Sequence, residues 1–217
     1  MNKSIKPLML AGLLTCCTSV IADENKSYRA YDSPVNYSYL QFYVGGGHID
    51  PDSDAIDEDN LTELGLSYQR MLSEHWIGEL DYEGHFIHGD KADLRNDRAA
   101  VRGLYRISLN DKSDVLFGAK LGVMRTKATR RSDDSTISSD TDFMYGISAE
   151  YRYGFSKKWE GGLGVEYTDA DHLDETQFTA DIVYYSSDKF GFGGYVSEAI
   201  GDKSNTTAIG LKARFRF

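Results

Sequence analysis

The sequence predicts an all-β fold: a closed, antiparallel, up-and-down transmembrane β-barrel with ten strands, or with eight as the alternative. Three observations lead to this fold class. Apolar residues recur at every second position in ten separate segments of the chain. The connections between these segments alternate between short turns and longer polar stretches. The chain also ends on an alternating segment whose last residue is Phe217, where an exposed terminus is usually polar and frayed.

The first 22 residues have the pattern of a signal peptide. Lys3 and Lys6 supply positive charge, an apolar run follows over 8–20, and Ala22 is a small residue suited to cleavage. The apolar run is too short for a comfortable membrane helix. We therefore predict a signal peptide at 1–22, a short N-terminal periplasmic segment at 23–36 and the barrel at 37–217.

Both cysteines of the chain, Cys16 and Cys17, lie in this apolar run, so cleavage after Ala22 leaves none. A lipoprotein alternative rests on Cys16, but the bulky Thr15 before it disfavours acylation. The full chain has a net charge of −10, and cleavage makes it −12 because the signal peptide carries two lysines and no acidic residue. No basic face emerges along the chain, so we expect no nucleic-acid partner.

The strands follow from the period-two pattern, and no segment of helical period interrupts them. Within 75–87, tryptophan, leucine, tyrosine and phenylalanine alternate with acidic residues, isoleucine and histidine. Within 141–154 aromatic residues alternate with polar ones and glycine, and within 158–168 apolar residues alternate with glycine and glutamate. The ten predicted strands are roughly 37–48, 61–71, 75–87, 97–109, 113–126, 141–154, 158–168, 176–186, 189–199 and 206–217.

The connections fall into two classes that alternate along the chain. The short ones lie near 72–74, 110–112, 156–158 and 186–188. The long or polar ones lie at 50–60, 88–96, 127–140, 169–175 and 201–206. Ten up-and-down strands place all short turns and both termini at one end, and all long loops at the other. Outer-membrane barrels show this asymmetry, with short periplasmic turns and longer external loops.

Alternation alone leaves open which face of each strand points outward. A soluble lipocalin-type barrel is the alternative, with apolar residues inside. Three features favour a membrane barrel with a polar interior: the apolar face is too rich in bulky aromatics for a small barrel core, the polar face pairs glycines with long charged side chains, and its charges balance. Eight acidic and eight basic residues form this predicted lumen charge network: Glu63, Glu79, Asp81, Glu83, Glu150, Glu160, Glu166, Asp181, Arg98, Arg102, Arg106, Lys120, Arg152, Lys212, Arg214 and Arg216.

Enclosed charges must be paired, because an unpaired buried charge is very costly. The last strand carries Lys212, Arg214 and Arg216 on its polar face. We expect these three cations to meet the acidic residues of the strand at 75–87 and its neighbours. The last strand should also hydrogen-bond to the first, since a bare sheet edge is not tolerated in lipid.

With these features the chain resembles the small bacterial outer-membrane β-barrel superfamily, which contains OmpA-like barrel domains and the opacity-type porin family. The residues that carry the resemblance are the signal segment, the alternating strands, the two classes of connection, and Phe217 with Phe215, Ala213 and Leu211 before it. The resemblance implies a bacterial outer-membrane location, contact with outer-membrane lipid and lipopolysaccharide, a monomeric state and no cofactor. It also implies assembly by the barrel-assembly machinery, with Phe217 and Phe215 as the assembly signal. The chain differs from the best-known small members in its ten strands and in lacking an appended peptidoglycan-binding domain.

The expected role is that of a small outer-membrane protein with a charge-filled lumen and a structural or surface-interaction function through its extracellular loops. A narrow-pore porin for ions or small solutes is the alternative. A barrel-embedded hydrolase is the second alternative, since His85, His88 and His172 have acidic neighbours that suit a general base. Acid-rich loops produce such neighbours by chance and no omptin motif is present, so we predict no catalytic residue.

A basic cluster follows the fifth strand and suits the phosphates of lipopolysaccharide. It consists of Arg125, Lys127, Arg130 and Arg131. The alternative is a loop whose charge is balanced internally by Asp133 and Asp134.

The acidic stretch 50–60 begins like a calcium-binding loop, with Asp50, Asp52 and Asp54 at alternate positions. The pattern then fails, because Ala55 replaces the required glycine and Leu61 replaces the bidentate glutamate. We expect a solvated acidic loop rather than a cation site, and we predict no metal centre.

Overall fold

The computed structural model describes residues 35–51, 59–89, 92–171, 173–202 and 204–217. The predicted signal peptide, nearly all of the segment 23–36 and most of the acidic stretch 50–60 lie outside the described residues. The unit Tyr31–Phe217 contains every strand of the described residues.

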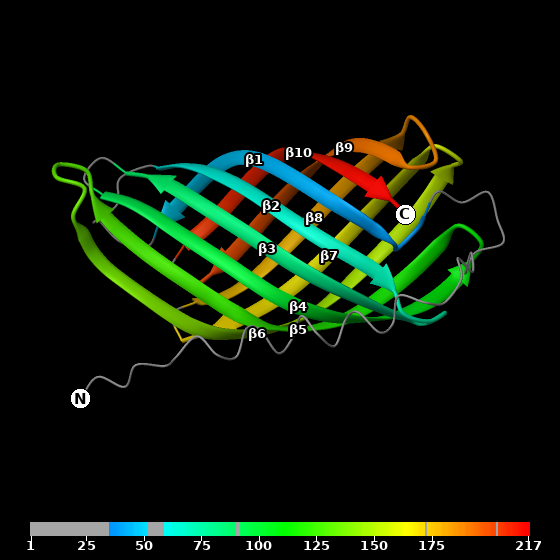
Figure 1. Ribbon diagram of the computed structural model, residues 1–217, viewed down its shortest axis with the longest axis horizontal. Helices are drawn as coiled ribbons and strands as arrows, with labels where there is room; N and C mark the ends of the chain where they lie inside the picture. The colour runs from blue at the N-terminus through cyan, green and yellow to red at the C-terminus, as the bar shows by residue number, and fades with distance from the viewer. Residues whose placement is uncertain (1–34, 52–58, 90–91, 172, 203) are drawn as a thin grey trace. The chain divides into compact units, whose positions relative to one another are not determined.

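The fold is a closed antiparallel barrel of ten strands, which confirms the predicted fold class and strand number. Each strand pairs with its neighbours in the chain, and β1 pairs with β10 to close the barrel (Figure 1). The strands are β1 (Tyr39–Pro51), β2 (Asp59–Met71), β3 (Trp76–His88), β4 (Ala92–Asn110), β5 (Ser113–Arg130), β6 (Thr136–Ser156), β7 (Trp159–Ala170), β8 (Leu173–Tyr185), β9 (Phe190–Gly201) and β10 (Ser204–Arg216). The described residues contain no helix that is long and apolar enough to cross a membrane.

The seam between β1 and β10 runs the full length of both strands, from Tyr39 opposite Arg216 to Pro51 opposite Ser204. Beyond it, the backbone amide of Phe217 donates a hydrogen bond of 3.3 Å to the carbonyl of Ser38. Pairing therefore continues to the last residue of the chain. This closure leaves neither strand with a free edge, as a lipid environment requires.

The four short turns lie where the sequence predicts them, over 72–75, 111–112, 157–158 and 186–189. The prediction of long loops at the other end is wrong for the connections that the structure describes. β5 and β6 are joined by residues 131–135 alone, and polar residues such as Lys127 and Ser139 face each other across the β5–β6 ladder. The polar stretches at 88–96, 169–175 and 201–206 likewise belong mostly to strands.

Strand pairing explains this difference, because residues of low hydrophobicity still form ladder hydrogen bonds when a partner strand continues beside them. β4, β5 and β6 reach 19, 18 and 21 residues, whereas about 9–11 tilted residues suffice to cross a bilayer. Figure 1 shows the hairpins of these strands extending at the end opposite the C-terminus. We call the two ends of the barrel the short-turn end, which carries Phe217, and the hairpin end.

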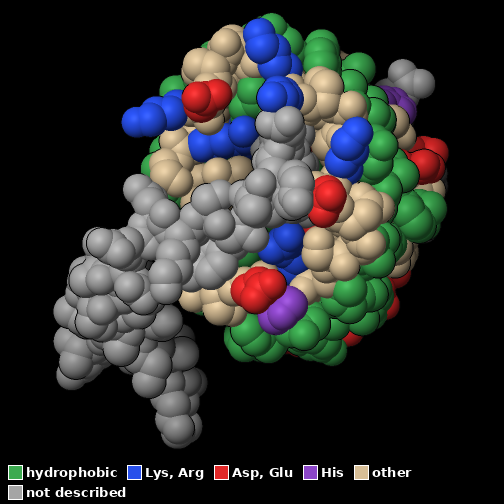
Figure 2. All heavy atoms as spheres, turned by 90° about the vertical axis from the view of Figure 1, so that its right-hand side faces the viewer, with side chains coloured by type: hydrophobic (Ala, Val, Ile, Leu, Met, Phe, Trp, Pro, Cys, Tyr) green, Lys and Arg blue, Asp and Glu red, His purple; other side chains and the backbone are tan. Residues whose placement is uncertain are grey.

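The outer wall is apolar, as predicted. Leu211 is 69% exposed and Ile209, Ile147 and Leu163 are similarly exposed, although all four are strongly apolar. In the view of the short-turn end, hydrophobic side chains cover the flank of the barrel while charged ones gather on the end face (Figure 2). An exposed apolar wall around a polar interior is the arrangement of a barrel that lies in lipid.

Candidate functional site

The lumen of the barrel is lined by charge. The strand register places all sixteen residues of the predicted network on the inner face, where each is buried or partly buried. A cavity of about 180 Å³ lies among them. Its lining includes acidic and basic side chains together with the hydroxyls of Tyr43 and Tyr195.

Glu160 on β7 is the centre of the cluster nearer the short-turn end, and only 1% of its side chain is exposed. Its carboxylate pairs with Arg214 and, at 3.0 Å, with Arg216. Arg214 also donates hydrogen bonds to the amide oxygen of Gln41 at 2.7 Å and to the hydroxyl of Tyr185 at 3.1 Å. The guanidinium is thus held by three groups, and only 1% of the Arg214 side chain is exposed, so its position is tightly fixed.

The expected partners of the cations on β10 are wrong. Arg214 and Arg216 meet Glu160 on β7, and Lys212 lies 3.4 Å from Asp181 on β8, which also accepts a bond of 3.0 Å from Arg152. Glu79 and Glu83 of β3 instead lie directly opposite Arg102 and Arg98 on the adjacent strand β4. Directly opposed residues on neighbouring strands are close enough to interact. The glutamates of β3 therefore have arginine partners on β4 and do not need the cations of β10.

A second cluster surrounds Glu166 on β7, deeper in the lumen. Arg102 and Lys120 both form ion pairs with this carboxylate. Arg102 also lies 3.4 Å from Glu150 and 3.9 Å from Glu79. One arginine therefore joins three strands of carboxylates, which is the pairing that enclosed charges require.

Two further charged residues of the lumen, Asp114 and Glu175, are not part of the predicted network. Asp114 is completely buried and lies 3.0 Å from Arg106, while Glu175 lies 2.5 Å from Arg98. Asp114 lies an even number of residues from Lys120 on β5, and Glu175 lies an even number of residues from Asp181 on β8, so each faces the lumen as its neighbour does. The alternation of side chains along each strand is the signal that could have identified both residues. The predicted loop at 169–175 includes Glu175, whereas β8 already begins at Leu173.

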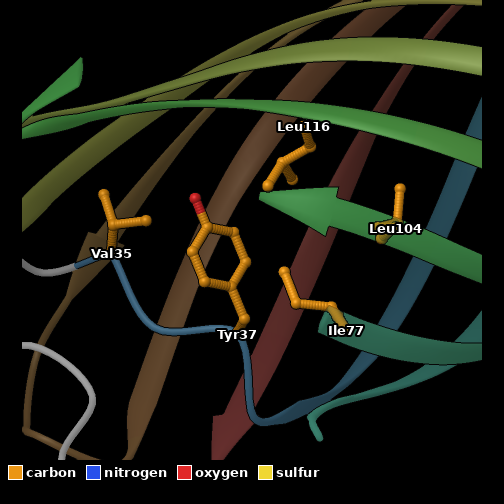
Figure 3. Close-up of a cluster of buried hydrophobic side chains, with 5 residues drawn as sticks. All are labelled: Val35, Tyr37, Ile77, Leu104 and Leu116. Carbon is orange, nitrogen blue, oxygen red and sulfur yellow. The ribbon is translucent and has the colours of Figure 1, made fainter. Parts of the chain in front are cut away.

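A cluster of buried apolar side chains lies inside the barrel at the short-turn end (Figure 3). Val35 and Tyr37 precede β1 and pack against Ile77, Leu104 and Leu116 from the inner faces of β3, β4 and β5. The sequence placed the start of the first strand at residue 37 and did not predict that this segment enters the barrel. Val35 and Tyr37 continue the alternation of this strand, but the alternation does not show what they pack against.

The hairpin end of the lumen contains a compact group of two carboxylates and one imidazole. Glu63 on β2 lies directly opposite His85 on β3, and Glu83 is two residues before His85 on the same face. His85 Nε2 lies 3.2 Å from Glu83 Oε1 and 3.5 Å from Glu63 Oε2. The hydroxyl of Tyr195 donates to Glu63 Oε1, and that of Tyr43 donates to Glu83 Oε1 at 3.1 Å.

Two glycines make room for the tyrosine that holds Glu63. The ring of Tyr195 lies where a side chain at Gly210 would stand, and its hydroxyl occupies the space that a side chain at Gly45 would fill. Both glycines lie on the inner face, so their lack of a side chain lets an aromatic ring cross between strands. Pairing glycine with a large neighbour is what a crowded barrel interior needs.

Of the other histidines considered as a general base, the described part of the chain contains only His88. His88 is exposed at the end of β3, 3.3 Å from Asp93. His172 lies outside the described residues. His85 lies inside the lumen, beside Glu63 and Glu83.

The predicted basic cluster divides into two pairs. Arg130 lies 3.6 Å from Asp133, and Arg131 lies 3.7 Å from Asp93 and donates to the carbonyl of Gly89 at 3.1 Å. The hydroxyl and amide of Ser135 both donate to the Asp133 carboxylate and hold its pKa below the usual value, so Arg130 faces an ionised partner at neutral pH.

Arg125 and Lys127 lie instead on the outer wall of β5, above its apolar residues. Arg95 on β4 is directly opposite Lys127, and Asp97 is directly opposite Arg125. Arg95 pairs with Asp97 at 2.7 Å, and its side chain remains about half exposed. The outer wall at the hairpin end therefore carries three neighbouring cations and one acid, which we call the wall patch: Arg95, Arg125, Lys127 and Asp97.

Comparisons with known proteins agree with this architecture. A family model described as "Outer membrane protein beta-barrel domain" matches residues 8–217. Protein opa of Haemophilus influenzae is 29% identical over 105 residues, which are 46% of this chain and 85% of that protein.

Among solved structures, the β domain of the Bordetella autotransporter BrkA has 13% identity and a TM-score of 0.51, covering 84% of this chain and all of that one. Neisserial surface protein A has 12% identity and a TM-score of 0.47, covering 82% of this chain and 96% of that one. At these identities the likeness concerns the fold alone.

Proposed function

This chain belongs to the outer membrane protein beta-barrel domain family of the bacterial outer membrane, and from this premise we propose that it is a closed barrel with a structural and surface-interaction role. The observation that carries the proposal is the state of the lumen. The sixteen charged residues of the predicted network, together with Asp114 and Glu175, line it, and the apolar cluster around Tyr37 lies at its short-turn end. A barrel whose interior is occupied in this way acts through its outer surface rather than by conduction.

The wall patch is the part of that surface with the clearest ligand chemistry. It stands above the apolar wall, at the height where a strand leaves the hydrocarbon region and meets lipid headgroups. The phosphates of lipopolysaccharide form charge-assisted contacts with arginine and lysine. Three cations against one acid leave a net positive charge for such contacts, so we assign lipopolysaccharide as the partner of Arg95, Arg125 and Lys127.

Arg130 and Arg131 support this role less well. Both are engaged by aspartates within the hairpin region, and Arg131 is further occupied by the Gly89 carbonyl. These contacts use N–H groups of both guanidinium groups, so fewer donors remain to bind an external anion. We therefore propose that lipopolysaccharide binds Arg95, Arg125 and Lys127 of the wall patch, rather than the four residues of the predicted basic cluster.

The test is a triple substitution, Arg95→Gln, Arg125→Gln and Lys127→Gln, with lipopolysaccharide measured per folded barrel after purification from outer membranes. We expect a severalfold loss of bound lipopolysaccharide. The matched control neutralises three exposed lysines in the short turns, Lys112, Lys157 and Lys189, and should keep the native amount. Equal lipopolysaccharide in the native protein and the triple variant would overturn the assignment.

A narrow pore is the second candidate, and the charged cavity of about 180 Å³ favours it. Ions could enter such a cavity if the apolar cluster at the short-turn end moved aside. Conductance across a planar bilayer separates this candidate from the closed barrel.

A further inference from the structure

We propose that Glu63, Glu83 and His85 form a binding site for a single divalent transition-metal ion, with Zn²⁺ as the best match. The site lies inside the lumen at the hairpin end, separate from the wall patch. The three side chains each offer one ligand atom, and these atoms all lie within 4.8 Å of one another.

The spacing of the ligand atoms is the first argument. Zinc binds nitrogen and oxygen at about 2.0–2.1 Å with tetrahedral geometry, which sets two ligand atoms about 3.3–3.4 Å apart. The distances from His85 Nε2 to Glu83 Oε1 and Glu63 Oε2 are 3.2 and 3.5 Å. Two of the three distances between ligand atoms therefore match a single ion, and the third, between the two carboxylate oxygens, is below 4.8 Å.

The state of the imidazole is the second argument. His85 Nε2 is buried, and within the described part of the chain it forms no well-aligned hydrogen bond, although two carboxylate oxygens are close. A buried nitrogen without a hydrogen bond is rare in a folded protein and calls for a cause. A metal ion between Nε2 and the two oxygens would satisfy all three atoms together.

The surroundings orient the carboxylates as a metal site requires. Glu63 turns Oε2 toward His85, while its other oxygen accepts the hydroxyl of Tyr195. Glu83 turns Oε1 toward His85, and Arg98 lies 3.8 Å from its Oε2. Hydrogen-bond and ion-pair partners that orient the ligand residues are typical of metal centres and strengthen metal binding.

Charge balance is the fourth argument. A divalent ion with two carboxylates and a neutral imidazole gives a site without net charge. Arg98 does not upset this balance, because its guanidinium is paired with Glu175. Imidazole with carboxylates suits zinc, whereas calcium and magnesium prefer oxygen ligands alone. Glu63 and Glu83 also line the lumen cavity, which leaves space for a water as fourth ligand.

The test uses the full barrel without a histidine tag, folded in detergent and titrated with Zn²⁺ and with Co²⁺ as a coloured substitute. We expect one ion per chain, a Co²⁺ absorption spectrum typical of tetrahedral nitrogen and oxygen ligands, and a higher unfolding temperature in Zn²⁺ than in EDTA. A native barrel that binds neither ion, or a Co²⁺ spectrum typical of octahedral water ligands, would overturn the proposal. Both results come from the unmodified protein and do not depend on any variant folding.

Variants then assign the ligands. Loss of partners behind a ligand weakens metal binding by about 10–100-fold, so His85→Ala should weaken it by at least about 100-fold and Tyr195→Phe by about 10-fold. His88→Ala and Glu150→Gln are the matched controls, an exposed histidine and a lumen carboxylate outside the site, and should leave affinity unchanged. Unaltered Zn²⁺ affinity in a folded His85→Ala barrel would contradict the assignment.

Discussion

The hydroxyl of Tyr37 donates a hydrogen bond of 2.7 Å to Asp114 Oδ2, which connects the segment before β1 to the start of β5 inside the lumen. Asp114 is completely buried, and it also accepts a hydrogen bond of 3.0 Å from Arg106. The guanidinium of Arg106 lies 5.7 Å from the centre of the Tyr37 ring. One tyrosine thus joins the apolar cluster at the short-turn end to the charge network above it.

Substituting Tyr37→Phe should lower the free energy of unfolding by about 1–3 kcal/mol, because a buried carboxylate loses a hydrogen-bond donor. The ring stays in place, so the apolar cluster keeps its packing. Denaturant unfolding of the barrel in detergent measures the change. Tyr151→Phe on the outer wall is the control and should alter stability by less than about 0.5 kcal/mol. Equal effects of the two substitutions would contradict the role of this bond.

Arg214 and Glu160 should show strong coupling in a double-mutant cycle. Removing one partner of a buried ion pair typically costs about 3–5 kcal/mol, since the other charge is left uncompensated. We expect this for Arg214→Met, and we expect the double variant Arg214→Met/Glu160→Gln to cost clearly less than the sum of the single substitutions. The exposed pair Arg130–Asp133 provides the comparison and should couple by no more than about 1 kcal/mol. Additive effects at Arg214 and Glu160 would show that the pair is not coupled.

Deleting Phe217 should reduce the amount of folded barrel in the outer membrane. The ring of Phe217 stacks on Tyr68 with the ring centres 5.4 Å apart, and its amide extends the pairing to Ser38. Both contacts are lost on deletion, together with the predicted assembly signal. Heat-dependent gel mobility of outer-membrane fractions measures the folded amount. Phe217→Tyr keeps the aromatic ring and the amide and should assemble normally; normal assembly of the deletion would count against the terminal signal.

The alternation of apolar and polar residues along the sequence was sufficient to predict the number of strands and which face of each strand is apolar. A residue such as Leu211 faces lipid and its neighbour Lys212 faces the lumen because side chains alternate strictly along a strand. Every charged residue assigned to the interior follows from that rule. The rule needs no knowledge of which strands touch across the barrel.

The partners inside the lumen depend on distances across the barrel, which a single strand does not encode. Arg214 meets Glu160 rather than Glu79 because side chains cross the interior, and a nearer arginine already faces Glu79. The length of the hairpins was missed for a related reason. Polar residues near 127–140 look like a loop in isolation, yet they pair as strands once a neighbour continues beside them. Tyr37 begins the predicted strand at 37–48, but the alternating pattern does not show that its side chain packs against Ile77, Leu104 and Leu116 across the lumen.

The closed lumen is the central claim, and conductance across a planar lipid bilayer tests it most directly. Folded native barrel should be reconstituted at a known density, with insertion verified by protease protection of the same preparation. We expect no discrete current steps, because the charge network occupies the interior and the cluster around Tyr37 lies at one end. Reproducible single-channel steps from the native protein would contradict the closed barrel and establish the narrow pore instead.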